Sequence, residues 1–203
     1  MMRRAVIALG MLLAWGSGVY GLNPALDVNQ YAHTVWNAGE NFPGGIIFAI
    51  AQTHDGYLWL GTEFGLLRFD GVRSVPWQPP AGQHLPSSQI RALLVARDGS
   101  LWIGTRDGLA SWKDGKLTQY GELAGQLVQS LLEDREGAIW AGGWAASTGR
   151  ICAIQSRRAE CYGEDGSLGH GVYSLYEDGG GNLWLGAGTG LWRWKPVPPK
   201  LYL

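Results

Sequence analysis

The chain has 203 residues, of which 46% are hydrophobic, and it contains 32 glycines and 11 tryptophans. Only 16% of the residues are charged, and the formal net charge is −1. This composition is typical of a folded, strand-rich protein and excludes a disordered chain or a coiled coil. Because there is no basic stripe, nucleic acid is not an expected partner.

The N-terminus predicts an export signal. Met1–Arg4 is positively charged, and residues 5–15 (AVIALGMLLAW) form an apolar run that is short for a membrane span. Val19 and Gly21 are permissive residues for cleavage after Gly21, and an uncleaved anchor is the alternative. We therefore expect a signal peptide over 1–21 and a periplasmic or otherwise extracytoplasmic mature chain.

A short hydrophobic run with the pattern Trp-x-Gly follows a turn four times along the chain. The copies read HDGYLWLG, RDGSLWIG, REGAIWAG and GGGNLWLG. Their tryptophans are spaced by 43, 38 and 44 residues, at Trp59, Trp102, Trp140 and Trp184. A strand-rich repeat of this period is typical of a β-propeller with one blade per repeat.

The second repeat indicates how one blade forms. Asp-Gly turns at 98–99 and 114–115 join its strands, because Gly accepts a positive φ without steric cost. The predicted strands are 90–96 (IRALLVA), 101–105 (LWIGT), 109–112 (LASW) and 117–120 (LTQY). The fold class is therefore predicted to be all-β, a propeller of about four blades with four antiparallel strands each.

The repeats also divide the chain. An N-terminal segment over 22–45 carries Gln30–Trp36 (QYAHTVW), which is expected to form an outer strand. The fourth strand of the last blade is expected to begin at Lys200–Leu203. Two assemblies remain open, a part of a seven-bladed propeller and a small four-bladed ring closed by Gln30–Trp36. The blades are expected over about 46–78, 90–120, 127–162 and 172–203.

Each repeat places its Trp and its Gly inside a strand. We interpret the tryptophans as residues that pack between blades, with an indole N–H that reaches a partner at the blade edge. An aromatic platform for a ligand is the alternative. A glycine inside a strand indicates a bulge or the close approach of another backbone. The glycines concerned are Gly61, Gly104, Gly142 and Gly186.

Cys152 and Cys161 are the two cysteines of the chain. A two-residue turn at Ser156–Arg157, in the register of the Asp114–Gly115 turn, places them directly opposite each other across a hairpin. A structural disulfide is therefore predicted. A redox-active pair lacks the C-x-x-C spacing, and a metal site lacks further ligands because the histidines are scattered. Neither a metal nor a cofactor is expected.

The repeats resemble the two-component regulator propeller repeat. The resemblance is clearest in DGYLWLGTEFGLLRFDGVR (55–73), in RDGSLWIGTRDGL (97–109) and in the N-terminal LDVNQYAHTVW (26–36). In that family, propellers form the periplasmic sensing part of membrane receptors, commonly followed by a β-sandwich, a transmembrane helix and an output module such as a histidine kinase. The resemblance implies an extracytoplasmic ligand-sensing module of such a receptor. The implied partners are downstream blades and a membrane-anchored output domain.

Ligand contacts are expected at the loops that join the second strand of a blade to the third and one blade to the next. Loops on a rigid scaffold are the usual binding positions. The selected residues are Glu63, His84, Arg106 and Trp144. Arg106 offers a fork for a carboxylate, and Trp144 offers an apolar face for a small molecule or saccharide. Gly143–Thr148 is expected to be a longer loop and the first place for a functional insertion.

Kinase phosphoacceptor and ATP-binding motifs do not occur, so the chain is not expected to be an enzyme and no catalytic residue is named. Two other functions remain open. The D-x-G-x-L-W turns are similar to the Asp-box turns of sialidase-like propellers, which points to an enzyme acting on carbohydrate. A protein-interaction scaffold is the other alternative, although the WD signature of WD repeats does not occur.

Overall fold

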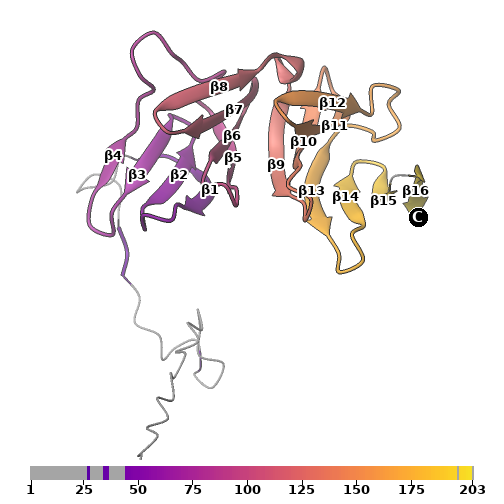
Figure 1. Ribbon diagram of the computed structural model, residues 1–203, viewed down its shortest axis with the longest axis horizontal. Helices are drawn as coiled ribbons and strands as arrows, with labels where there is room; N and C mark the ends of the chain where they lie inside the picture. The colour runs from indigo at the N-terminus through magenta and orange to yellow at the C-terminus, as the bar shows by residue number, and fades with distance from the viewer. Residues whose placement is uncertain (1–26, 28–33, 37–43, 196, 203) are drawn as a thin grey trace, which may run out of the picture. The chain divides into compact units, whose positions relative to one another are not determined.

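The computed structural model describes residues 27, 34–36, 44–195 and 197–202 (Figure 1). The chain divides into two units, Met1–Val35 and Trp36–Leu203, and the fold is that of the second unit. This unit contains four sheets, each of four antiparallel strands in chain order. The predicted all-β propeller class is confirmed. The predicted signal peptide lies outside the described residues.

Each sheet is one blade, and the blades follow one another along the chain. Blade 1 comprises β1 (Ile47–Gln52), β2 (Leu58–Thr62), β3 (Leu66–Phe69) and β4 (Ser74–Pro76). Blade 2 comprises β5 (Ile90–Val95), β6 (Leu101–Thr105), β7 (Gly108–Lys113) and β8 (Lys116–Tyr120), followed by the 3-10 turn η2 (Gly121–Leu123). Blade 3 comprises β9 (Leu127–Glu133), β10 (Ile139–Ala145), β11 (Thr148–Gln155) and β12 (Arg158–Tyr162). Blade 4 comprises β13 (Val172–Glu177), β14 (Leu183–Ala187), β15 (Gly190–Lys195) and β16 (Val197–Tyr202).

Blade 4 departs from the sequence expectation at its outer edge. Its fourth strand, β16, already begins at Val197 and pairs with β15, whereas the strand was expected to begin at Lys200. The sheet is therefore complete without a strand from the N-terminus. Most of the expected outer strand Gln30–Trp36 lies outside the described residues, and residues 34–36 are not in a strand. Trp36 instead packs edge-on against Phe69 of β3, with ring centroids 5.1 Å apart.

The hydrophobic core lies between the sheets rather than within one of them. Three clusters of buried side chains each join two neighbouring blades: Trp59 and Ile90 belong to the first, Trp102 and Val128 to the second, and Ile151 and Val172 to the third. Among the described residues, no cluster joins blade 4 to blade 1. The closed four-bladed ring is therefore not the arrangement found here.

Three of the repeat glycines, Gly61, Gly104 and Gly142, lie where the next blade comes closest. A Cβ on Gly61 would stand 2.7 Å from Cγ2 of Ile90, and a Cβ on Gly142 would stand 2.7 Å from Cγ1 of Val172. The close neighbour is thus a β-branched side chain of the following blade, and at Gly104 the expected backbone approaches as well, because a Cβ there would stand 3.0 Å from the Val128 carbonyl oxygen. The expected bulge is present too, but in blades 1, 2 and 4 it lies on the first strand, opposite the glycine.

The tryptophan N–H groups are held by the turn that precedes their strand. Trp59 Nε1 donates to Thr53 Oγ1 at 3.0 Å, and Trp140 Nε1 donates to Asp134 Oδ2 at 2.8 Å. In blade 2 the corresponding position is an alanine, and Trp102 Nε1 donates to Ser100 Oγ at 2.9 Å instead. In blades 1 to 3 each indole therefore fixes the turn of its own blade while its ring packs in the core.

The predicted disulfide is confirmed. Cys152 and Cys161 are directly opposed across β11 and β12 and are bonded to each other. The hairpin turns at Ser156 and Arg157, which both adopt a positive φ, of 50° and 67°. Two successive residues with positive φ match the twist of the strands and set a two-residue turn. The register that this turn imposes is what brings the two cysteines together.

Candidate functional site

The strand order gives every blade two ends. The loops between second and third strands and the connections from blade to blade lie at one end, the loop end. The turns between first and second strands and between third and fourth strands lie at the other, the turn end.

Three of the four sequence-selected residues have defined neighbours at the loop end. Glu63 Oε1 accepts a hydrogen bond from the Ile46 amide at 3.2 Å. Trp144 packs against Tyr173, with ring centroids 5.7 Å apart. Arg106 donates from Nη1 to Gln89 Oε1 at 3.4 Å.

The fourth residue, His84, lies in the connection between β4 and β5. This connection reaches the outer strand of blade 2, because the carbonyl of His84 accepts a hydrogen bond from Gln119 Nε2 at 2.6 Å. Within the described part of the chain, no hydrogen bond, ion pair or ring contact joins any two of the four selected residues. Their role in binding stays a prediction.

The longer loop expected over Gly143–Thr148 is instead a strand extension. β10 continues to Ala145, and β11 begins at Thr148, which pairs with Ala145. Ala146 and Ser147 form a tight turn, with φ of 47° and 67°. Residues with a branched or bulky side chain adopt such a φ at a cost, whereas these two small residues tolerate it. The extra residues of this repeat therefore lengthen the hairpin rather than open a loop.

A pair of arginines meets at the loop end of blade 2. Arg91 donates from Nη2 to Gln89 Oε1 at 3.4 Å, so Arg91 and Arg106 share one amide oxygen. The Arg91 guanidinium lies 4.1 Å from the ring centroid of Phe48 in blade 1. Its Nε is buried and has no hydrogen-bond partner. None of the ion pairs among the described residues involves either arginine.

Sequence reasoning selected Arg106 but missed Arg91 and Gln89. Arg91 is the single charged residue in the run IRALLVA, which the sequence predicts to be an apolar strand. The structure places it at the strand bulge between Ile90 and Ala92, opposite β6. A β-bulge changes the direction in which a side chain points. The sequence feature that could have indicated this residue is a charge at the second position of the first strand of a blade.

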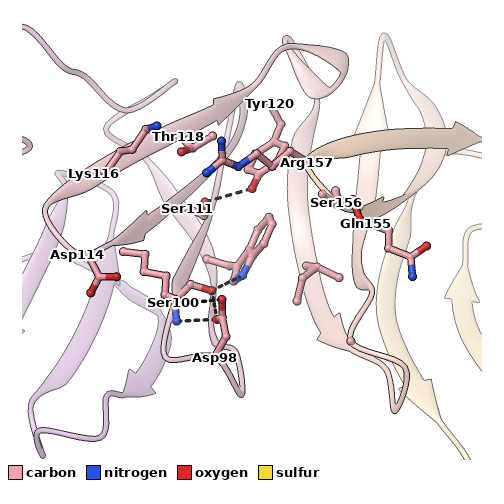
Figure 2. Close-up of a pocket in the computed structure, with 15 residues that line it drawn as sticks. Asp98, Ser100, Ser111, Asp114, Lys116, Thr118, Tyr120, Gln155, Ser156 and Arg157 are labelled. Atoms are coloured by element: carbon pink, nitrogen blue, oxygen red, sulfur yellow. Dashed lines mark hydrogen bonds and ion pairs between the residues drawn. The ribbon is translucent and has the colours of Figure 1, made fainter.

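A second candidate is a cavity of about 480 Å³ at the turn end, between blades 2 and 3 (Figure 2). Most of the residues that line it are polar, and they include Thr118, Lys116 and Arg157. Figure 2 shows the Arg157 side chain beside Tyr120, whose hydroxyl lies 3.2 Å from Ser111 Oγ. Burial raises the pKa of the Tyr120 hydroxyl, so this group stays protonated. None of the four sequence-selected residues lines this cavity.

The acidic group of this cavity is already engaged. Asp98 Oδ2 accepts a hydrogen bond from Lys113 Nζ at 2.8 Å, and Asp98 Oδ1 accepts one from Ser100 Oγ at 2.6 Å. These contacts, that of Lys113 first, lower the pKa of the Asp98 carboxyl from 3.8 to about 2. A carboxylate satisfied in this way serves the turn rather than a ligand.

Among the described residues, no group of three His, Cys, Asp or Glu residues is placed to hold a metal ion. Nor does this part of the chain include a helix with the length and apolar character needed to cross a membrane.

The comparison with known families matches the repeats themselves. The family described as "Two component regulator propeller" matches residues 41–64, 84–107 and 166–189, and each segment contains one Trp-x-Gly. These three segments are repeats of the two-component regulator propeller type. The third Trp-x-Gly, at Trp140, lies outside the matched segments of these regulator propeller repeats. A search of curated proteins found no match.

Solved structures share the fold of these propeller repeats at low sequence identity. The extracellular domain of BT4673 from B. thetaiotaomicron, assigned to the hybrid two component systems, is 21% identical with a TM-score of 0.63. Virginiamycin B lyase from Staphylococcus aureus is 15% identical with a TM-score of 0.58. The alignments cover 82% and 77% of this chain, but 23% and 54% of those proteins. The chain thus spans about a quarter of the first relative, and the shared fold occurs both in a domain assigned to a two component system and in a lyase.

Proposed function

We propose that this chain is a non-catalytic, extracytoplasmic sensing propeller of a two-component receptor, and that it binds an anionic ligand at Arg91 and Arg106. One observation carries the proposal. Two guanidinium groups converge on the single oxygen Gln89 Oε1, each at 3.4 Å, and neither forms an ion pair with a described carboxylate. A carboxylate or another oxyanion supplies what this pair lacks.

The geometry leaves the binding capacity of the pair largely unused. Both hydrogen bonds to Gln89 are long, and a guanidinium carries five N–H donors in a planar fork that matches a carboxylate in a bidentate manner. The buried Nε of Arg91 has no partner, which is costly for a charged group until an acceptor reaches it. Phe48 holds the Arg91 plane from one side through a cation–π contact.

Several findings favour sensing outside the cytoplasm. The regulator propeller repeats match over three segments, and the structural relatives include the extracellular domain of BT4673, assigned to the hybrid two component systems. The Cys152–Cys161 disulfide suits an oxidising compartment, and the N-terminal sequence has the pattern of an export signal. The downstream blades and the membrane-anchored output domain are proposed as the partners that would convert binding into a signal.

The test is calorimetric titration of the purified chain with D-galacturonate, with D-galactose as its neutral counterpart. We expect the uronate to bind and the neutral sugar to bind much more weakly. Arg106→Ala and Arg91→Ala should each weaken uronate binding by about tenfold or more, since each removes a charge-assisted contact worth about 1.5–3 kcal/mol.

Arg73→Ala is the matched control, because Arg73 is an exposed arginine in the β3–β4 turn of blade 1, at the opposite end. It should leave uronate binding unchanged. Equal binding of uronate and galactose, or uronate binding that survives loss of both Arg91 and Arg106, would contradict the proposed ligand class and site.

A further inference from the structure

One position on the third strand of a blade is aromatic in three blades and aliphatic in the fourth. It is the residue that pairs with the second-strand residue just before the repeat tryptophan. In blades 1 to 4 the residues at this position are, in order, Phe69, Trp112, Ile154 and Trp194. Blade 3 is therefore the exception.

In two of the interfaces between blades, this position forms a ring pair with the blade before. The ring centroids of Trp112 and Trp77 lie 5.1 Å apart, and those of Trp194 and Tyr162 lie 5.2 Å apart. Trp77 follows the last strand of blade 1, and Tyr162 ends the last strand of blade 3. An indole of the later blade thus fills the space beside an aromatic ring of the earlier one.

Between blades 2 and 3 the indole of this pair is missing. Tyr120 holds the place of Trp77 and Tyr162, since each stands opposite the third-strand residue that pairs with the repeat glycine. The residue of blade 3 that should meet Tyr120 is Ile154, and both belong to one buried cluster. A smaller side chain leaves space at such a position. The cavity of about 480 Å³ lies here, with both residues in its lining.

This cavity has a buried apolar floor and an exposed polar rim. Four buried hydrophobic side chains line it, namely Trp102, Tyr120, Ile139 and Ile154. Trp102 and Tyr120 stack on each other, with ring centroids 5.0 Å apart. The exposed polar residues of the lining come from turns of both blades. Pockets for small molecules commonly have volumes of about 300–1,000 Å³, and this cavity falls in that range.

Two cations on the rim remain available to a ligand. The side chains of Lys116 and Arg157 form no ion pair or hydrogen bond with the described residues. Figure 2 shows Arg157 extending from the turn after β11 towards blade 2. The third cation of the lining, Lys113, is held by Asp98 at 2.8 Å. Asp114, the other acid of the lining, lies well apart from Arg157 in Figure 2.

We infer that this cavity binds a small aromatic carboxylate. Its planar ring lies between Tyr120 and Ile154, where the interfaces on either side hold an indole, and contact with the tyrosine ring stabilises it. Its carboxylate meets Arg157 and Lys116 through charge-assisted hydrogen bonds. The inference is independent of the anion site proposed at the loop end, because this cavity lies at the turn end.

The test is calorimetric titration of the purified chain with indole-3-acetate, with tryptamine as a cationic counterpart that carries the same ring. We expect indole-3-acetate to bind, and tryptamine to bind about tenfold more weakly or less, because its ammonium would meet two like charges. Ile154→Trp should weaken the binding of indole-3-acetate by about tenfold or more, since the new indole would fill the place of the ligand ring. Far-ultraviolet circular dichroism checks that each variant is folded.

Arg157→Asn tests the carboxylate end of the site, and it carries the test on its own if Ile154→Trp does not fold. Asn removes the charge and tolerates the positive φ of 67° found at this position. The variant should weaken the binding of indole-3-acetate by about tenfold. Arg158→Asn is the matched control, because Arg158 is the next residue, is exposed and does not line the cavity. It should leave binding unchanged.

Arg106→Ala separates this site from the one at the loop end, and it should leave the binding of indole-3-acetate unchanged. Loss of binding in Arg106→Ala would place the carboxylate at the loop end and overturn the inference. No detectable binding of indole-3-acetate, equal binding of tryptamine, or binding that survives both Ile154→Trp and Arg157→Asn would also overturn it. Displacement of indole-3-acetate by D-galacturonate would contradict the aromatic class of the ligand and point to a sugar acid instead.

Discussion

Cγ2 of Ile90 lies 2.7 Å from the point at which a Cβ on Gly61 would stand. The first strand of blade 2 thus approaches the second strand of blade 1 more closely than any side chain at Gly61 would permit. The same relationship joins Gly104 to Val128 and Gly142 to Val172. Gly61, Gly104 and Gly142 therefore each act on the blade that follows them rather than on their own strand.

Gly104→Ala should destabilise the protein. The added Cβ would stand 2.8 Å from Cγ1 of Val128 and 3.0 Å from the Val128 carbonyl oxygen, and the backbone atom cannot rotate away. Overpacking of this kind costs about 1–3 kcal/mol. Urea unfolding measures it, and Gly121→Ala is the control, because a Cβ at Gly121 meets no described atom within 4 Å. Equal unfolding midpoints for both variants would contradict the packing argument.

Arg135→Ala should weaken the contact between blades 3 and 4. Arg135 Nε lies 2.7 Å from Glu177 Oε1, and Arg135 Nη2 donates to the Asp178 carbonyl at 2.6 Å. The arginine side chain is half exposed, so we expect a loss of only about 0.5–1 kcal/mol, which should shrink as salt is added. Chemical unfolding at low and high salt measures both effects, and a salt-independent loss would point to packing instead.

Removing the disulfide with the double substitution Cys152→Ala and Cys161→Ala should lower the free energy of unfolding. The bond closes a short loop with a sequence separation of 9, and the chain-entropy treatment gives about 2–3 kcal/mol for such a loop. Unfolding of the unmodified chain with and without a thiol reductant provides the comparison. The double variant could be destabilised while a reductant leaves the unfolding midpoint of the unmodified chain unchanged. That result would show that the lost stability comes from the packing of Cys152 rather than from the bond.

Asp98 should make stability fall in acid. Its carboxyl has a pKa lowered from 3.8 to about 2, first by the Lys113 hydrogen bond. A lowered pKa stabilises the folded state above the ordinary pKa, and that contribution is lost as the pH falls from 3.8 towards about 2, because the unfolded chain binds the proton first. The side chain is more than half exposed, so solvent screening keeps the effect small.

The measurement is the urea midpoint of unfolding across that acidic range. Asp98→Asn should flatten the acid-side slope relative to the unmodified chain. Asp114→Asn is the control, since this carboxylate of the same cavity accepts no hydrogen bond from the described residues and Asn tolerates the positive φ found there. If the Asp98→Asn variant keeps the acid-side slope of the unmodified chain, the acid sensitivity comes from other carboxylates.

Much of the fold follows from local chemistry and was therefore readable in the sequence. The Asp-Gly turns and the Trp-x-Gly period set strand length and order, and the strands of blade 2 begin and end within one residue of the expected positions. The Cys152–Cys161 pairing was predictable as well, because a two-residue turn fixes the register of a hairpin and so determines which residues face each other.

The candidate site could be predicted only in part. Arg106 lies in a turn between strands, where position alone indicates exposure, but Arg91 sits in an apolar strand and is re-aimed by a bulge. Their meeting at Gln89 depends on how β5 and β6 lie against each other. The prediction of a longer loop at Gly143–Thr148 was wrong, because the extra residues lengthen a hairpin and do not open a loop.

The sequence by itself determined the repeat, the strands, their turns and the disulfide, because each depends on residues a few positions apart. Only the tertiary structure decided which surfaces are filled and which stay open. Ile47 and Ile90 occupy equivalent positions in their repeats, yet one is exposed and the other is completely buried. The difference is the presence of a neighbouring blade, and contact between sheets depends on packing across the fold rather than on any pattern within a repeat.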